Sequence, residues 1–198
     1  MEISRMRTLA GSRYLNFTLD RESYCMEILK VKELMGMTDI TPLPQTPAFI
    51  RGVINLRGQI IPIIDLRLKF GMEFLEYHKR TSIIVVELEI EGENMLMGLI
   101  VDAIQDVIAI PEEKIKVLPY INTRVRAEYV RGVADTPEGM KIVLDVHKIL
   151  SDEEFVQLKA VAPSGDAAAA NGAGAASGTG TGTRASKKSA SSEAVTGA

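Results

Sequence analysis

The side chains that most often carry catalysis or bind metals are few and scattered in this sequence. There are two histidines, His78 and His147, and a single cysteine, Cys25. Their separation gives no Cys/His metal spacing, and neither histidine has a neighbouring nucleophile and carboxylate that would indicate a triad. Neither of the common glycine-rich phosphate-binding motifs is present. An enzyme is expected to show at least one such set, so the sequence predicts a binding module with no cofactor and no metal.

Arginines that interrupt an apolar stretch are better candidates for a functional contact. Residues 51–66 read RGVINLRGQIIPIIDL and contain two Arg-Gly pairs. The segment NLRG is typical of a tight hairpin turn in which Gly58 supplies the permissive backbone. Arg57 is then expected at the hairpin tip, where its five N–H donors are available to a partner's carboxylate or carbonyl groups. The alternative is a charge that serves only solubility.

Short stretches rich in Val and Ile predict a mainly β protein. The expected strands lie at 14–19, 25–34, 53–56, 60–64, 82–90, 96–104 and 141–146. Pro62 cannot donate a backbone hydrogen bond, so its strand is expected at a sheet edge or at a bulge.

Helical signals are fewer and short. Thr46-Pro47 resembles an N-cap followed by a first-turn proline. Asp65 is expected to cap a short helix that stops at Gly71. Ser151 and Glu154 form a capping box ahead of FVQLKAV, which predicts a C-terminal helix.

The chain contains an internal repeat. Residues 49–70 match residues 129–150 at a constant offset of 80, and residues 25–34 match residues 98–107 at an offset of 73. Two copies with about five short strands each predict two small closed barrels.

The repeat distinguishes residues that recur in both copies, and so are needed for the fold, from residues found in only one copy. Arg51 recurs as Arg131 and Asp65 as Asp145, so we interpret Arg51 as mainly structural and both aspartates as N-caps. Arg57 instead corresponds to Pro137 in the second copy, so an arginine is not needed for the turn. This difference favours a role for Arg57 outside the fold.

Glu33 has a less specific signal. It lies near the end of the expected strand 25–34, and its counterpart in the second copy is Asp106. It is either a charge that protects a strand edge or a contact residue on a mixed surface.

Composition divides the chain into three parts. Residues 1–12 are expected to be flexible, residues 13–161 to form the folded domain with its two halves divided near 71–81, and residues 162–198 to be disordered. In that last part 29 of 37 residues are Ala, Gly, Ser or Thr. The lone Cys25, the absence of a visible signal segment and the short aliphatic runs favour a cytoplasmic protein without membrane insertion.

The stretch TPAFIRGVINLRGQIIPIIDLRLKFGM, residues 46–72, resembles the signature of the CheW family of bacterial chemotaxis coupling proteins. YCMEILKVKEL (24–34) and LMGLIVDAIQDVIAIPEEKI (96–115) resemble other strands of that family, so the resemblance covers about residues 13–161. It implies two intertwined SH3-like five-stranded β-barrels with short helices and a C-terminal helix, in agreement with the repeat.

The resemblance also implies a role and a set of contact residues. Proteins of the family link the cytoplasmic tip of transmembrane chemoreceptors to the regulatory domain of the histidine kinase CheA, as non-catalytic adaptors within cytoplasmic arrays. The family's contact positions correspond here to Val31, Glu33, Gly52, Arg57 and Gly58.

Two other functions are compatible with such a domain. One is coupling in a kinase pathway other than chemotaxis, which the sequence does not distinguish. The other, from a different class, is a small-barrel nucleic-acid-binding protein. The net charge of −3 and the scattered aromatic residues disfavour it, because such proteins need a basic face with stacking rings.

Overall fold

The computed structural model describes residues 12–90, 92–117 and 125–161. The sequence-based predictions for residues 1–11 and 162–198 therefore lie outside the described residues. The first half contains β1 (Ser12–Leu19), β2 (Glu22–Glu27), η1 (Ile28–Lys30), β3 (Val31–Gly36), β4 (Ile50–Leu56), β5 (Gln59–Asp65) and α2 (Leu66–Lys69). The second half contains β6 (Ser82–Ile90), β7 (Glu93–Val101), β8 (Ala103–Ile110), η2 (Glu112–Lys114), β9 (Ile115–Lys116), η3 (Ala127–Tyr129), β10 (Val130–Thr136), β11 (Gly139–Leu144), η4 (Val146–Lys148) and α3 (Asp152–Val161).

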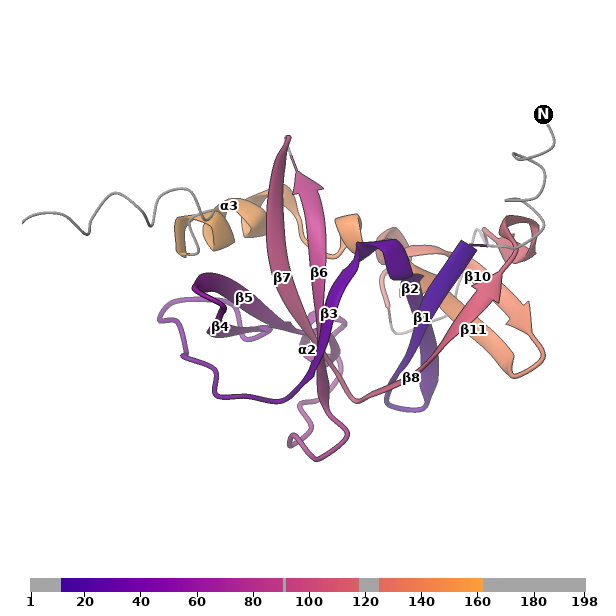
Figure 1. Cartoon of the computed structure of the whole chain (residues 1–198), viewed down its shortest axis with the longest axis horizontal. Coiled ribbons are helices and arrows are strands. Elements are labelled where there is room, and N and C mark those ends of the chain that lie inside the picture. The colour runs from indigo at the N-terminus through magenta and orange to yellow at the C-terminus, as the bar shows by residue number, and fades with distance from the viewer. Residues whose placement is uncertain (1–11, 91, 118–124, 162–198) are drawn as a thin grey trace, which may run out of the picture. The chain divides into compact units, whose positions relative to one another are not determined.

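These strands form two sheets, and each sheet contains strands from both halves of the chain. One sheet has the order β3-β6-β7-β5-β4, and the other has the order β8-β1-β2-β11-β10-β9. Figure 1 shows the β1–β2 hairpin beside β8, β10 and β11, and the β6–β7 hairpin beside β3. The two orders are the same once β9 is set aside, so the sequence repeat corresponds to two equivalent sheets that have exchanged their first hairpins.

Both sheets must curl. In a flat six-stranded sheet the outer strands would lie about 24 Å apart, from a strand spacing of about 4.8 Å. The outer strands β8 and β9 are joined through residues 111–114, a connection that spans at most about 19 Å. In the other sheet, Thr41 follows outer strand β3 and pairs with Val53 of the opposite outer strand. The predicted fold class, mainly β with two intertwined SH3-like units, short helices and a C-terminal helix, is confirmed.

The hydrophobic core has one large and two small clusters. The five-stranded sheet encloses a cluster of aliphatic residues: Ile54, Ile61, Ile63, Ile83, Val85 and Ile100. The six-stranded sheet encloses a smaller one: Tyr14, Cys25, Ile110, Ala134 and Val143. The large cluster contains residues from both sheets and from α3, including Phe155 and Leu158. The two sheets therefore share one core and bury much of their apolar surface against each other.

Local predictions of caps and turns are mostly confirmed. The Asp65 carboxylate accepts hydrogen bonds from the backbone N–H groups of Arg67 at 2.9 Å and Leu68 at 3.3 Å, and Asp145 accepts one from His147 at 3.2 Å. At the start of α3, Ser151 N–H donates to Glu154 and Glu154 N–H donates to the Ser151 hydroxyl, as expected for a capping box.

Four local predictions are wrong. Thr46-Pro47 begins a single turn rather than a helix, because β4 already starts at Ile50. The expected long strand 25–34 is broken at η1, where the chain passes from one sheet to the other. The expected strand 96–104 is broken in the same way at Asp102, between β7 and β8. Pro62 lies in the inner strand β5 rather than at an edge. Its missing donor is tolerated because pairing with β7 begins only at Ile63.

Cys25 lies in the small core cluster of the six-stranded sheet and is fully buried. Burial raises the pKa of its thiol to about 12. Because the thiolate is the reactive form, we expect Cys25 to label at pH 8 at least about 100-fold more slowly in the native protein than in urea. The measurement is a time course with a chromogenic disulfide reagent. Rapid labelling of native protein would contradict the inward orientation of Cys25 in β2.

Candidate functional site

Arg57 occupies the tip of the β4–β5 hairpin. The turn residues Arg57 and Gly58 have φ values of 54° and 90°, and the Asn55 side chain accepts a hydrogen bond from Gly58 N–H at 2.8 Å. Two positive φ values are characteristic of a type I′ turn, which matches the right-handed twist of the strands. The Arg57 side chain is 80% exposed. The predicted placement at an exposed tip is confirmed. The left-handed backbone is unfavourable for arginine, so the turn itself does not explain this residue.

Glu33 is oriented by a bulge in β3. Val31 pairs with Val86 and Glu33 pairs with Val85, which leaves Lys32 as the extra residue. The Glu33 carboxylate bonds to Arg57 Nη2 at 3.0 and 3.1 Å. A second ion pair, 2.6 Å long, joins Lys32 to Glu87 of β6. The bulge thus places two adjacent charged residues in two ion pairs, one to the hairpin tip and one to β6.

These ion pairs line a hollow of about 440 Å³. Its apolar lining comes from Leu56, Val85 and Leu96. Its polar lining comes from Lys32, Glu33, Arg57, Gln59, Glu87 and Asn94. Val85 is fully buried, so the exposed apolar part of this lining is limited to Leu56 and Leu96, beside a mainly polar and charged surface.

The five predicted contact residues do not all lie at this hollow. Glu33 and Arg57 bond to each other, and exposed Gly58 is in the same turn. Val31 is half-buried and packs against the large core cluster. Gly52 is buried, and a Cβ placed there would lie 2.1 Å from the Thr41 carbonyl oxygen. Gly52 therefore allows the segment around Thr41 to pack closely against β4. Its effect on the surface is indirect, through the position of β4.

The matching position of the six-stranded sheet has different residues. Asn16 stands where the other sheet has Val85, and its amide donates to Gln105 at 2.7 Å and to Asp106 at 2.9 Å. Lys141 stands where the other sheet has Ile61, and it is almost fully buried. In the six-stranded sheet, hydrogen-bonded Asn16 and Asp106 therefore stand at the positions that Val85 and Glu33 occupy in the five-stranded sheet.

The two equivalent arginines also differ in their surroundings. Arg131 bonds to the carboxylates of Glu27 and Glu112 and donates to the Tyr14 hydroxyl at 3.3 Å. It therefore connects β10 to β1, β2 and η2, as expected of a structural arginine. Arg51 instead lies over the rings of Phe74 and Tyr77, with its guanidinium carbon 5.1 and 5.9 Å from the centroids. No motif in the sequence indicates these aromatic partners.

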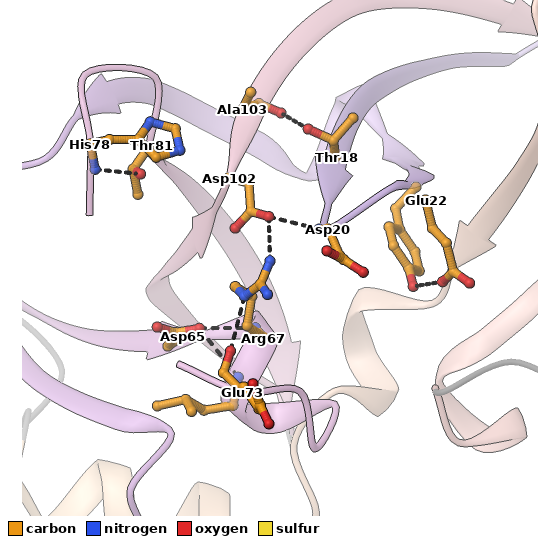
Figure 2. Close-up of polar contacts among 12 residues, drawn as sticks. Thr18, Asp20, Glu22, Asp65, Arg67, Glu73, His78, Thr81, Asp102 and Ala103 are labelled. Atoms are coloured by element: carbon orange, nitrogen blue, oxygen red, sulfur yellow. Dashed lines mark hydrogen bonds and ion pairs between the residues drawn. The ribbon is translucent and has the colours of Figure 1, made fainter. Parts of the chain in front are cut away.

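A partly buried ion pair joins the two sheets where the chain passes from β7 to β8. Figure 2 shows the Asp102 carboxylate accepting hydrogen bonds from Arg67 at 2.6 Å and from Asp20 N–H at 2.7 Å. Arg67 also donates to the Glu73 carbonyl at 3.1 Å. Arg67 belongs to α2 and Asp20 to the β1–β2 turn, so one carboxylate holds elements of both sheets. Sequence reasoning missed this cluster because Asp102 is 35 residues from Arg67 and 82 residues from Asp20.

Within the described residues, no group of three His, Cys, Asp or Glu side chains is placed to hold a metal ion. In the same part of the chain, none of the helices has the length and apolar character needed to span a membrane.

The comparisons with known proteins agree with one another. The family model for the CheW-like domain matches residues 13–154. The chemotaxis protein CheW of Klebsiella aerogenes is 40% identical over 154 residues, covering 78% of this chain and 90% of the relative. The chemotaxis protein CheW of Treponema pallidum is 34% identical over 144 residues, covering 73% of this chain and 85% of the relative. The crystal structure of the scaffolding protein TtCheW from Thermoanaerobacter tengcongensis has 38% identity and a TM-score of 0.65, covering 73% of this chain and 90% of that one.

The fold is a two-sheet β protein with an exposed ion pair beside a hollow. The chain belongs to the CheW-like family. The resemblance inferred from residues 46–72 is thereby confirmed.

Gly52 allows a direct test of the packing behind the surface. Its φ is 138°, a region that residues with a side chain rarely adopt, and an added Cβ would collide with Thr41. We expect Gly52→Ala to lower the free energy of unfolding by on the order of 3 kcal/mol. Gly36→Ala is the matched control, since no atom lies within 4 Å of a Cβ at Gly36. Equal urea midpoints for the two variants would show that the Gly52 contact is not needed.

Arg57 allows a test in which no loss of stability is expected. Asn-Gly is the preferred pair for a type I′ turn, so Arg57→Asn should relieve an unfavourable backbone. The lost exposed ion pair with Glu33 should cost at most about 1 kcal/mol. We expect the free energy of unfolding in urea to be unchanged or higher. A decrease of more than about 1 kcal/mol would mean that Arg57 serves the fold.

Proposed function

We propose that this protein is a non-catalytic adaptor that couples transmembrane chemoreceptors to the histidine kinase CheA in bacterial chemotaxis. The observation that carries the proposal is the family match along residues 13–154, at up to 40% identity to chemotaxis proteins over nearly their whole length. The exposed ion pair between Arg57 and Glu33, next to a hollow, supplies a contact surface suited to that role.

In this proposal Arg57 makes the main directional contact. Its guanidinium has five N–H donors, and only those on Nη2 bond to Glu33. The other donors can bind a partner's carboxylate or carbonyl group. Leu56 and Leu96 provide apolar contact area beside it. Val31, Gly52 and Gly58 act through the backbone by holding β3, β4 and the turn in place.

The proposed partners are the regulatory domain of CheA and the cytoplasmic tip of the receptors, so the protein is expected in the cytoplasm at membrane-associated arrays. No role in nucleic-acid binding or membrane insertion is proposed. A coupling protein acts by making one binding event change another, and such couplings are typically worth about 1–3 kcal/mol. Several modest contacts in an array reinforce one another through effective concentration.

A second candidate is coupling in a kinase pathway with a different output. The protein PilI of Pseudomonas aeruginosa is 29% identical over 90 residues, which covers 46% of this chain. The chemotaxis relatives match over a much larger share of the chain, so chemotaxis is the favoured pathway.

The test is reconstitution of kinase, receptor cytoplasmic fragment and this protein, with kinase autophosphorylation and complex assembly as readouts. We expect the unmutated protein to support both. Arg57→Glu should weaken assembly about tenfold or more, because a reversed charge at a contact replaces attraction with repulsion. The matched control is Arg126→Glu, which reverses another exposed arginine that is paired with an acid, Glu128.

The double variant Arg57→Glu with Glu33→Arg separates two roles of the pair. It restores an ion pair at the tip but moves the positive charge to β3. If Arg57 contacts a partner, the double variant stays defective. If it assembles normally, the pair only shapes the turn. Failure of the unmutated protein to change kinase activity with receptor would refute the coupling function itself.

A further inference from the structure

Arg51 and Arg131 occupy equivalent positions, but among the described residues only Arg131 has acidic partners. Two carboxylates, those of Glu27 and Glu112, bond to Arg131. In the same part of the chain, no carboxylate lies within ion-pair distance of Arg51. The fold therefore provides one arginine site that is filled internally and one that is open to a ligand.

The surroundings of Arg51 are aromatic. The rings of Phe74 and Tyr77 pack edge to face with centroids 5.4 Å apart, beneath the Arg51 guanidinium. The Tyr77 hydroxyl donates to the Asp65 carboxylate at 3.0 Å, which ties the rings to the N-cap of α2. The Arg51 guanidinium lies within 6 Å of both ring centroids, which is within range of a cation–π attraction. Its planar fork of N–H donors is suited to a bidentate bond to a carboxylate.

Apolar surface lies beside this arginine. Phe74 is 50% exposed and Leu75 is 44% exposed. Aromatic residues and arginine together are characteristic of the energetically important parts of protein contacts. The same loop carries exposed Glu73 and Glu76 as well as exposed Lys79 and Arg80, so its own charges balance. Arg51 is the cation that lies against the exposed apolar side chains, which suits one carboxylate flanked by apolar groups.

We propose that Arg51, Phe74, Leu75 and Tyr77 form a docking surface for a protein segment that carries a single Asp or Glu next to an apolar side chain. Arg51 and the hairpin tip are six residues apart along β4, or about 20 Å, so this surface is distinct from the hollow at Arg57. The proposal holds whichever pathway the protein serves.

The test replaces Phe74 with p-benzoylphenylalanine in cells that normally make this protein, followed by illumination and mass-spectrometric mapping of the cross-linked segment. We expect a cross-link to another protein within a few residues of an Asp or Glu. Adding Arg51→Gln should reduce its yield about tenfold or more, as for loss of a charged hydrogen-bonded pair. Arg51→Lys, which keeps the charge and the ring contact but not the bidentate geometry, should give an intermediate yield. Lys79→Gln, which removes an exposed charge from the same loop, should leave the yield unchanged.

Thermal unfolding of each purified variant confirms that it is folded. The proposal is overturned by the absence of any cross-link to another protein, or by a cross-link only to a second copy of this chain. It is also overturned if folded Arg51→Gln gives the unmutated yield. A cross-link to a protein other than a kinase or receptor would uphold the surface and count against the function proposed above.

Discussion

Neither half of the chain completes a sheet by itself, and the candidate site depends on this constraint. Each sheet joins the two halves through one antiparallel and one parallel ladder. The antiparallel ladders are β3–β6 and β1–β8. The parallel ladders are short: Ile63–Asp65 of β5 pair with Gly98–Ile100 of β7, and Ile142–Val143 of β11 pair with Tyr24–Cys25 of β2. The hollow takes Glu33, Leu56 and Arg57 from the first half and Val85, Glu87 and Leu96 from the second. Its geometry is therefore correct only when both halves have folded together.

The duplication acts as an internal comparison. Features present in both copies belong to the fold. Gly52 and Gly132 both allow a neighbouring strand to approach more closely than a Cβ would permit, and Asp65 and Asp145 both cap the short helix after the hairpin. Features present in one copy need another explanation. The open hollow and the arginine at the hairpin tip occur at the five-stranded sheet. At the equivalent place of the six-stranded sheet, Asn16 and Asp106 form a polar cluster.

What could be predicted from the sequence was local. The turn at Arg57-Gly58, the caps at Asp65, Asp145 and Ser151, and the repeat itself depend on residues close in sequence or on direct similarity between segments. The break in the expected strand 25–34 could not be predicted in this way, because η1 marks a change of sheet that depends on distant pairing. The aromatic partners of Arg51 were missed for a similar reason. Phe74 and Tyr77 reach it from a connecting segment without helix or strand, which has no periodic pattern to place it.

The cluster around Asp102 shows how a contact at one sheet can act on the other. Asp102 lies at the bend where β7 ends in one sheet and β8 begins in the other, and it bonds to Arg67 and to the Asp20 backbone. Arg67 and Asp102 are only 13% and 16% exposed, so salt screens their attraction much less than it screens surface pairs. At the corresponding position of the other crossing, from β2 to β3, the residue is Leu29, which is 87% exposed. One crossing is thus fixed by a partly buried charge and the other presents an apolar side chain to solvent. Displacing the end of β7 at Asp102 would therefore also displace the β1–β2 turn and α2, unless the ion pair with Arg67 and the hydrogen bond from Asp20 were broken.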